Sequence, residues 1–172
     1  MAKIILNLAI SVDGYIARED GGFDWIVGQG DKVADTNEEF NFTEFLESID
    51  VVIMGGECYR QGMANDYTNK TVYVVTKSIE EDRDNIKFVG SNMVEVIKSE
   101  REQGKNIWLF GGGRMIDAFL KANVIDEYII GIIPTILGSG RKLFLEDNPQ
   151  ILLKLQKYSV TDGVMVMIYS KR

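Results

Sequence analysis

The stretch IWLFGGGRM, residues 107–115, joins an apolar run, three successive glycines and the start of a helix-like pattern. Apolar residues without polar alternation are typical of a strand buried on both faces, as in a parallel sheet. Gly111, Gly112 and Gly113 then lie at the junction of strand and helix, where a β-carbon would block both the turn and the approach of phosphate oxygens. The stretch therefore predicts an α/β fold with a cradle of backbone amides for a diphosphate.

Apolar runs and helix-like patterns alternate along the whole chain of 172 residues, which predicts one α/β domain over residues 1–172. Strands are expected at residues 3–11, 51–54, 71–76, 86–89, 107–110 and 127–133, and helices at 57–61, 92–103 and 114–122. The pair Asp162-Gly163 separates two further strand patterns and predicts an antiparallel hairpin.

Another helix is expected after Thr36, because Thr36 and Glu39 have the spacing of a capping box. Its buried stripe would consist of four apolar residues at helical spacing: Phe42, Phe45, Leu46 and Ile49.

Composition excludes several classes of function. The net charge of −7 argues against a nucleic-acid-binding surface. The chain has no histidine and a single cysteine, Cys58, so neither a thiolate cluster nor an imidazole-based metal site is expected. The apolar run at residues 4–12 is too short to span a bilayer, and no signal-peptide cleavage pattern follows it. A cytoplasmic location without membrane attachment is the simplest expectation.

Further candidate residues follow the other expected strands, because ligands of parallel sheets bind at the carboxyl ends of strands. Asp13 in SVDGYIA either delivers a carboxylate to a cleft or forms a turn. The pair Gly55-Gly56 opens a short helix, as an anion site or for close packing. The triplet 76–78, Thr-Lys-Ser, either clasps a phosphate or forms a solvated loop. Gly138 lies in the similar glycine-rich segment IPTILGSGRKLF, where Arg141 and Lys142 are either phosphate ligands or solvated cations.

The order of these motifs is more informative than any one of them. SVDGYIA, VVIMGGECY, VYVVTKS, IWLFGGGRM and IPTILGSGRKLF follow one another along the chain. This order resembles the dihydrofolate reductase-like superfamily, and within it the reductase domain of the bifunctional riboflavin-biosynthesis deaminase–reductase (the RibD C-terminal domain) and its stand-alone relatives. The resemblance implies three layers, with a central, mostly parallel sheet of about eight strands that ends in the hairpin. In the dihydrofolate reductases a cis peptide joins the first two glycines of the triplet, so the resemblance raises the question whether the bond between Gly111 and Gly112 is cis.

The resemblance implies NADPH as cofactor. Residues 111–115, that is Gly111, Gly112, Gly113, Arg114 and Met115, would hold the diphosphate, and Gly55, Gly56 and Tyr59 would hold the cofactor from the other side. Thr76, Lys77 and Ser78 would receive the 2′-phosphate, and the backbone of Ala9 and Ile10 would contact the nicotinamide. Many relatives have Gly-Arg where this chain has Gly55-Gly56, which leaves Lys77 as the main cation for the 2′-phosphate.

The resemblance also implies hydride transfer to a small heterocyclic, pyrimidine- or pterin-like substrate, as in 5-amino-6-(5-phosphoribosylamino)uracil reductases. Asp13 is the first candidate for the proton donor, and the substrate would lie near Asp13, Trp25, Glu39 and Gly138. Glu39 as a capping residue and Trp25 as a core residue are the alternatives. A non-catalytic nucleotide-binding module and a flavin-binding protein remain open as other functions. Relatives often pair, so a homodimer is expected.

Overall fold

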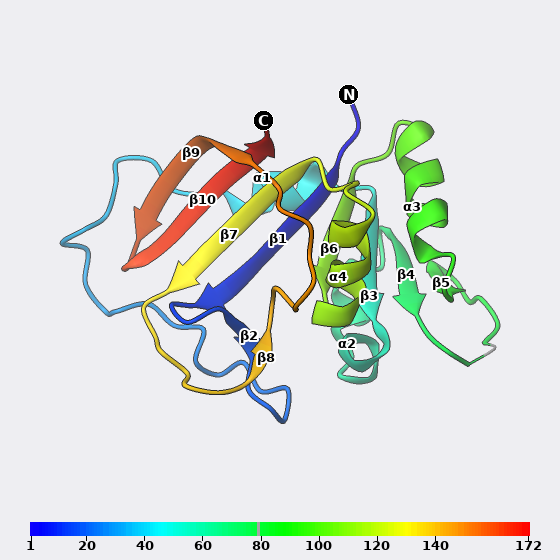
Figure 1. Ribbon diagram of the computed structural model, residues 1–172, viewed down its shortest axis with the longest axis horizontal. Helices are drawn as coiled ribbons and strands as arrows, with labels where there is room; N and C mark the ends of the chain where they lie inside the picture. The colour runs from blue at the N-terminus through cyan, green and yellow to red at the C-terminus, as the bar shows by residue number, and fades with distance from the viewer. Residues whose placement is uncertain (79) are drawn as a thin grey trace.

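The computed structural model describes residues 1–78 and 80–172. One eight-stranded sheet runs through the molecule in the order β5-β4-β3-β6-β1-β7-β10-β9 (Figure 1). Its strands are β1 (Ile4–Ser11), β3 (Val51–Gly55), β4 (Thr71–Val75), β5 (Ile86–Val89), β6 (Ile107–Gly111), β7 (Glu127–Ile133), β9 (Leu153–Thr161) and β10 (Val164–Lys171). A second, two-stranded sheet pairs β2 (Tyr15–Ala17) with β8 (Arg141–Lys142).

The first six strands of this order, from β5 to β7, are joined by parallel ladders, whereas β10 is antiparallel to both β7 and β9. Asp162 and Gly163 form the turn between β9 and β10 with φ of 51° and 73°. Two successive positive φ values are those of a type I′ turn, which matches the twist of a hairpin. The predicted mostly parallel sheet with a terminal antiparallel hairpin is therefore confirmed.

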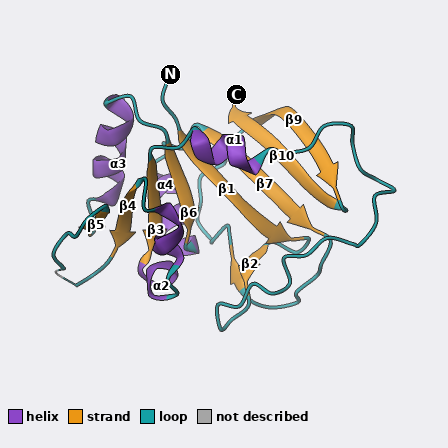
Figure 2. Cartoon of the chain, turned by 180° about the vertical axis from the view of Figure 1, so that it is seen from behind, coloured by secondary structure: helices purple, strands orange, loops and turns teal. Residues whose placement is uncertain are grey.

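Helices lie on both faces of the sheet. Helices α3 (Met93–Glu102) and α4 (Gly113–Lys121) lie on the face turned toward the viewer in Figure 1. The short helix α1 (Phe42–Glu47) lies on the opposite face, seen from behind in Figure 2. Helix α2 (Gly56–Arg60) and the 3₁₀-helix η1 (Met63–Tyr67) follow β3.

Strand residues alternate between two cores, one on each face. The core under α3 and α4 contains Ile4, Leu6 and the four α4 residues predicted to be buried: Met115, Ile116, Phe119 and Leu120. The core on the α1 side contains Ile5, Phe45 and Trp108. Both faces of the central strands are thus covered, which explains why β3 and β6 lack polar alternation.

The expected capping box at Thr36 is wrong. Helix α1 begins at Phe42, and its N-cap is Asn41, whose side chain accepts the amide of Glu44 at 3.1 Å. The Thr36 hydroxyl instead accepts the amide of Val160 at 2.9 Å, so it ties the preceding loop to β9. A hydroxyl three residues before a glutamate has the right spacing for a cap, but here tertiary contact with the hairpin takes it.

Candidate functional site

Strands β1 and β6 separate halfway along the sheet. Their parallel ladder joins Ile4 to Ile107 and ends where Leu6 meets Leu109, although β1 continues to Ser11. The register of β6 with β3 shifts at the same level, between Ile53 and Met54. The carboxyl half of β1 therefore keeps its ladder to β7 on one edge and opens toward β6 on the other.

Backbone groups of a strand point alternately to its two edges, so the open edge can be assigned. The carbonyls of Lys3 and Asn7 face β6, because they accept Ile107 N at 2.8 Å and Trp108 Nε1 at 2.8 Å. Ala9 is next in this series, so its N–H and C=O point into the opening. The backbone of Ile10 points to the ladder with β7. Of the two residues predicted to contact a nicotinamide, Ala9 alone presents its backbone to the opening.

The glycines at the carboxyl ends of β3 and β6 lie against each other. A β-carbon added to Gly112 would lie 3.6 Å from the Cα of Gly55, and one added to Gly55 would lie 3.6 Å from the carbonyl oxygen of Gly111. Gly112 has a φ of 102°, a conformation that side chains rarely adopt. A β-carbon on Gly113 would meet the Lys142 carbonyl at 2.8 Å. Backbone conformation thus requires glycine at 112 and packing requires it at 113, whereas a β-carbon on Gly111 would meet only Cys58 Sγ at 3.9 Å.

The peptide bond between Gly111 and Gly112 is trans, so the cis bond raised by the resemblance does not occur. Gly112 is the N-cap of α4, and the first helical bond runs from Ile116 N to Gly112 O. The amides of Gly113, Arg114 and Met115 therefore have no partner within the helix, and its first turn carries no acidic residue. Free amides at the positive end of the helix dipole suit an anion.

Helix α2 begins beside these glycines, Gly55 and Gly111 to Gly113, which together form the glycine corner of the site. A β-carbon on Gly56 would lie 3.2 Å from the Val75 carbonyl, so the ends of β3 and β4 are also in contact. The ring of Tyr59 packs edge-to-face against the ring of Phe88, with 5.6 Å between the ring centroids. Cys58 is part-buried, and burial raises the pKa of its thiol, which disfavours a nucleophilic role.

The triplet after β4 forms a small hydroxyl-stabilised turn. Thr76 Oγ1 accepts the amide of Ser78 at 3.1 Å, and the Thr76 amide donates to Val89 O. Lys77 is exposed and makes no ion pair with any described residue. The structure therefore brings the predicted cofactor residues of β3, β4 and β6 together at the carboxyl ends of three adjacent strands.

A cavity of ≈ 350 Å³ lies on the α1 face of the same part of the sheet. Strands β1, β6, β7 and β10 form its base, and the loop before α1 forms its wall. Its lining is Asn7, Leu8, Ala9, Ile26, Val27, Gly28, Phe40, Phe42, Trp108, Gly131, Ile133, Val164 and Val166. Ala9 thus lines the cavity and also faces the opening toward β6.

The loop that walls this cavity is fixed to the β9–β10 turn. Gln29 N donates to the Asp162 carbonyl at 2.9 Å, and Gly30 N donates to the Asp162 carboxylate at 2.7 Å. Asp162 N in turn donates to Asp35 at 2.7 Å. The hairpin therefore holds the wall of the cavity in place.

Asp13 is a loop anchor in this structure. Its carboxylate accepts the Ser11 hydroxyl at 2.6 Å, the Leu137 amide at 3.1 Å and the Gly138 amide at 2.8 Å. The bond from Ser11 is the main reason why the pKa of Asp13 lies below its ordinary value. A carboxylate with a lowered pKa is ionised at neutral pH, which does not suit a general acid. Of the other predicted substrate residues, only Gly138 contacts Asp13.

Trp25 and Glu39 do not line the cavity. Trp25 is 4% exposed and donates to the Gly22 carbonyl at 3.3 Å, so it packs as a core residue. Glu39 is exposed, while its neighbours Phe40 and Phe42 contribute to the lining.

Arg141 closes the far side of the corner. Its guanidinium pairs with Glu57 of α2 at 2.6 Å and donates to the Glu19 carbonyl at 3.0 Å. The bond from Arg141 is the main cause of the lowered pKa of Glu57. Arg141 therefore fastens the loop after β2 to α2 and is not free to bind a phosphate.

Sequence reasoning missed Asn7, Trp108 and Gly131 as site residues. Asn7 interrupts the otherwise apolar run of β1, and Gly131 interrupts that of β7. A polar residue and a glycine inside buried strands are the signals that could have found them, because each breaks the pattern of a packed core.

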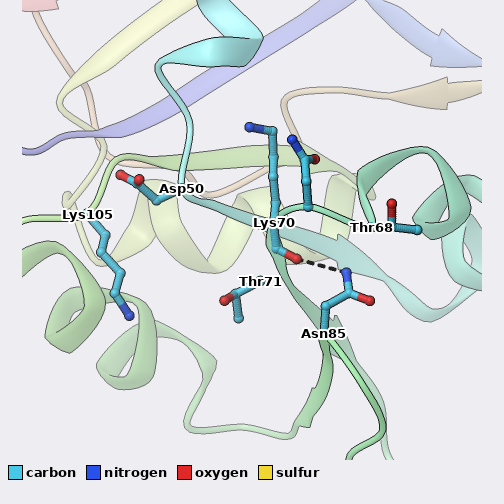
Figure 3. Close-up of a pocket in the computed structure, with 7 residues that line it drawn as sticks. Asp50, Thr68, Lys70, Thr71, Asn85 and Lys105 are labelled. Atoms are coloured by element: carbon cyan, nitrogen blue, oxygen red, sulfur yellow. Dashed lines mark hydrogen bonds between the residues drawn. The ribbon is translucent and has the colours of Figure 1, made fainter.

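A second cavity, of ≈ 380 Å³, lies at the opposite end of the sheet (Figure 3). Asp50, Lys70, Asn85 and Lys105 line it, and each lies just before or shortly before a strand. Two of these side chains already donate hydrogen bonds to backbone carbonyls. Lys70 Nζ donates to Ile49 O at 2.7 Å, and Asn85 Nδ2 donates to Lys70 O at 2.8 Å. The amino ends of parallel strands are not where ligands of such sheets bind, so the carboxyl-end cavity is the candidate site.

Comparison with known proteins identifies the family of the chain. The chain matches the RibD C-terminal domain family over residues 2–101 and, in a second, overlapping match, over residues 68–167. It is 34% identical over 163 residues to the uncharacterized protein YwjB of Bacillus subtilis (strain 168), a match that covers 90% of this chain and 89% of that protein.

Two solved structures share the fold. A putative riboflavin biosynthesis protein from Shewanella sp. PV-4 superposes with a TM-score of 0.82 at 27% identity, covering 99% of both chains. Dihydrofolate reductase from Enterococcus faecalis, complexed with NADP(H) and RAB-propyl, superposes with a TM-score of 0.68 at 16% identity, covering 99% of this chain and 96% of that one. The dihydrofolate reductase-like fold expected from the motifs is confirmed. Within the described part of the chain, none of the helices has the length and apolar character needed to span a bilayer.

Proposed function

Because the chain belongs to the RibD C-terminal domain family, we propose that it is a reductase that uses NADPH to reduce a small heterocycle, pyrimidine- or pterin-like. The opening between β1 and β6 is the observation that carries this proposal. It leaves the N–H and C=O of Ala9 facing a gap, and the carboxamide of a nicotinamide offers a matching acceptor and donor. The same residue lines the cavity that would receive the substrate.

The residues at the strand ends fit the rest of this cofactor. The free amides of Gly113, Arg114 and Met115 would hold the diphosphate, with Gly55 and Gly56 on the other side. The turn at residues 76–78 would hold the 2′-phosphate through two hydroxyls and an ammonium. The bound cofactor would supply hydride, and the protein would contribute orientation and the exclusion of water.

We propose that Asp13 acts on the reaction indirectly, by holding residues 137 and 138 at the edge of the site. No ionisable side chain lines the cavity among residues 1–78 and 80–172, so water is the proposed source of the proton.

Calorimetric titration of the purified protein with NADPH tests the proposal directly. We expect saturable binding of one cofactor per chain, followed by NADPH oxidation when a pyrimidine or pterin substrate is supplied. Absence of binding for both NADPH and NADH at millimolar concentration would refute the proposal.

Lys77→Ala tests the contact with the 2′-phosphate. Because Lys77 is exposed, its loss should cost about 1 kcal/mol in NADPH binding, roughly a fivefold loss of affinity, and leave NADH binding unchanged. Lys154→Ala, on the exposed edge strand β9, is the matched control and should change neither affinity. Equal weakening of both cofactors by Lys77→Ala would remove Lys77 from this role.

The lack of an ionisable group in the cavity specifically favours a second candidate, a module that binds a nucleotide without turning it over. Cofactor binding without oxidation across a panel of pyrimidines, pterins and quinones would support it, and robust turnover of any of them would exclude it.

A homodimer is also proposed. Leu155, Tyr158 and Met165 are 47%, 57% and 39% exposed. The pairing of β9 with β10 puts them on the sheet face that carries α3 and α4. Neither helix covers the β9–β10 part of that face (Figure 1). An exposed apolar strip of this kind is typical of an interface. Light scattering should give twice the monomer mass of 19.4 kDa.

A further inference from the structure

The carboxyl-end cavity carries no charge. None of the residues that line it within the described chain is acidic or basic. The segment that supplies its outer wall, residues 18–39, contains seven acidic and two basic residues, a net charge of −5 out of −7 for the whole chain. A ligand therefore enters a neutral cavity through a region of negative potential, which disfavours anions.

Two arginines that contact this segment are already paired, whereas Lys32, the other basic residue in it, forms no ion pair with a described residue. Arg18 binds Asp24 at 2.9 Å, and Arg141 binds Glu57 at 2.6 Å. Binding a phosphate with either guanidinium would mean breaking an existing ion pair. No cation lines the cavity among the described residues, so a phosphate group bound there would have no charged partner in the lining.

The base of the cavity is shaped for a flat group. Ala9, Gly131 and Val166 are direct neighbours across β1, β7 and β10 and form a row of small residues. A β-carbon on Gly131 would meet its nearest neighbours at 3.9 Å, which is ordinary contact, so packing does not require glycine there. A glycine inside a strand without a packing reason marks close approach by another group. Trp108 and Phe42 add aromatic walls.

Asn7 provides the polar group of this cavity. Its side chain is 9% exposed, and its Nδ2 is enclosed without a hydrogen-bond partner among the described residues. A buried polar group without a partner costs about 1–3 kcal/mol, which a ligand can recover by pairing with it. Because rotation about χ2 exchanges the amide oxygen and nitrogen, Asn7 can serve either a donor or an acceptor.

We infer that the substrate is an uncharged, flat aromatic ring with one hydrogen-bonding edge, bound between the Ala9–Gly131–Val166 row and Trp108 with its polar edge on Asn7. The inference rests on the proposed function and narrows it. It excludes phosphorylated substrates, including the phosphoribosylamino-uracil that the family resemblance implies. The ring is bound as a free base or nucleoside.

Binding of matched pairs tests this inference, with quenching of the tryptophan fluorescence to which Trp25 and Trp108 both contribute as the readout. Uridine and guanosine should bind at least tenfold more tightly than uridine and guanosine 5′-monophosphates, and free uracil should also bind. Equal or tighter binding of the monophosphates overturns the inference, as does failure of all neutral probes to bind at millimolar concentration.

Two variants test whether the preference for uncharged ligands comes from the cavity itself. Val27→Arg adds a cation at the cavity wall, where the side chain is 59% exposed, and should raise the affinity for uridine monophosphate relative to uridine at least tenfold. Val33→Arg adds the same charge to the same loop outside the cavity, where the side chain is 92% exposed, and should not. Equal changes in the two variants overturn the inference. Asn7→Leu should weaken uridine binding about tenfold, and unchanged binding overturns the role of Asn7.

The outcomes separate this inference from the proposed function, because nucleoside binding is measured without cofactor. Binding of neutral rings without any binding of NADPH would remove the proposed function and keep the charge selectivity of the cavity. Binding of NADPH together with preference for the monophosphates would keep the proposed function and remove the inference.

Discussion

The two cavities of this protein have similar volumes, ≈ 380 Å³ at the amino ends of the strands and ≈ 350 Å³ at the carboxyl ends, but opposite chemistry. In the first, the Lys70 ammonium already donates to the Ile49 carbonyl, and the Asn85 amide donates to the Lys70 carbonyl (Figure 3). In the second, an apolar lining encloses Asn7 Nδ2 without a partner. The difference teaches that an incomplete set of hydrogen bonds, rather than the size of a hollow, marks a place for a ligand.

Glu100→Gln should have the largest effect, because it breaks a completed network beside the amino-end cavity. Glu100 is 7% exposed and accepts the Tyr73 hydroxyl at 2.7 Å as well as Lys105 Nζ. Loss of the charge should lower the free energy of unfolding by about 2 kcal/mol in urea titration, since a buried donor loses its charged acceptor. Binding of NADPH and of nucleosides should be unchanged. The exposed Glu102→Gln on the same helix is the control and should be neutral.

The pH dependence of the difference in unfolding free energy between the wild type and Glu100→Gln is a further test of the same network. Burial alone would raise the pKa of Glu100, but the hydrogen bonds from Lys105 and Tyr73 outweigh it and leave the pKa below its ordinary value. A lowered pKa stabilises the fold above the unfolded value of about 4.3, and this stability is lost as pH falls through the folded pKa. The advantage of the wild type over Glu100→Gln should therefore shrink below about pH 4. A constant difference across this range would contradict the assignment.

Gly112→Ala should have the next largest effect, at the carboxyl ends. Its φ of 102° strains any side chain by about 1–2 kcal/mol, and the new methyl group would lie 3.6 Å from the Gly55 Cα and 4.0 Å from the Met115 Cβ, at the start of α4. Gly104 has a φ of 88° with nothing within 4 Å of an added β-carbon, so Gly104→Ala carries the strain alone. Both variants should lose similar stability, but only Gly112→Ala should lose tenfold or more in NADPH affinity. If calorimetry gives the two variants equal affinities for NADPH, Gly112 does not lie at the cofactor site.

Much of the fold could be predicted because it depends on local pattern. Strand β7 has the predicted bounds, and the hairpin forms at Asp162-Gly163, where two positive φ values require such residues. The positions of the glycine corner and of the residue 76–78 turn also followed from the sequence, because chain order alone puts them at the ends of parallel strands.

The remainder depends on contacts between distant segments, which one sequence does not reveal. Thr36 has the spacing of a helix cap but binds Val160, 124 residues away. The separation of β1 from β6 results from the ladder ending at Leu6 and Leu109, and no residue type marks that point. Asp13 was predicted as a proton donor because the segment SVDG matches the family pattern, whereas its bonds to Leu137 and Gly138 exist only in the folded chain.

Asp13 variants should have a smaller effect, because Asp13 positions a loop. Asp13→Asn keeps one acceptor oxygen for the amides of Leu137 and Gly138, whereas Asp13→Ala removes both. We expect a several-fold rise in KM for Asp13→Ala, less for Asp13→Asn, and a small change in kcat, measured by NADPH oxidation. The lowered pKa keeps Asp13 ionised at neutral pH, so neither variant should remove a pH limb between about pH 5 and 8. Loss of kcat in both variants together with loss of such a limb would instead identify a proton donor.

Asn7→Leu should have the smallest effect on stability, which makes it the sharpest contrast with Glu100→Gln. Both side chains are buried, at 9% and 7% exposure, but only Glu100 has partners. Replacing an unpaired amide by an apolar group of similar size removes a desolvation cost, so the free energy of unfolding should stay within about 1 kcal/mol of the wild type or rise. The backbone carbonyl that binds Trp108 Nε1 is retained, so urea titration reports the amide alone. A loss of about 2 kcal/mol would mean that the amide is paired in solution, and Asn7 would then be part of a finished core like Glu100.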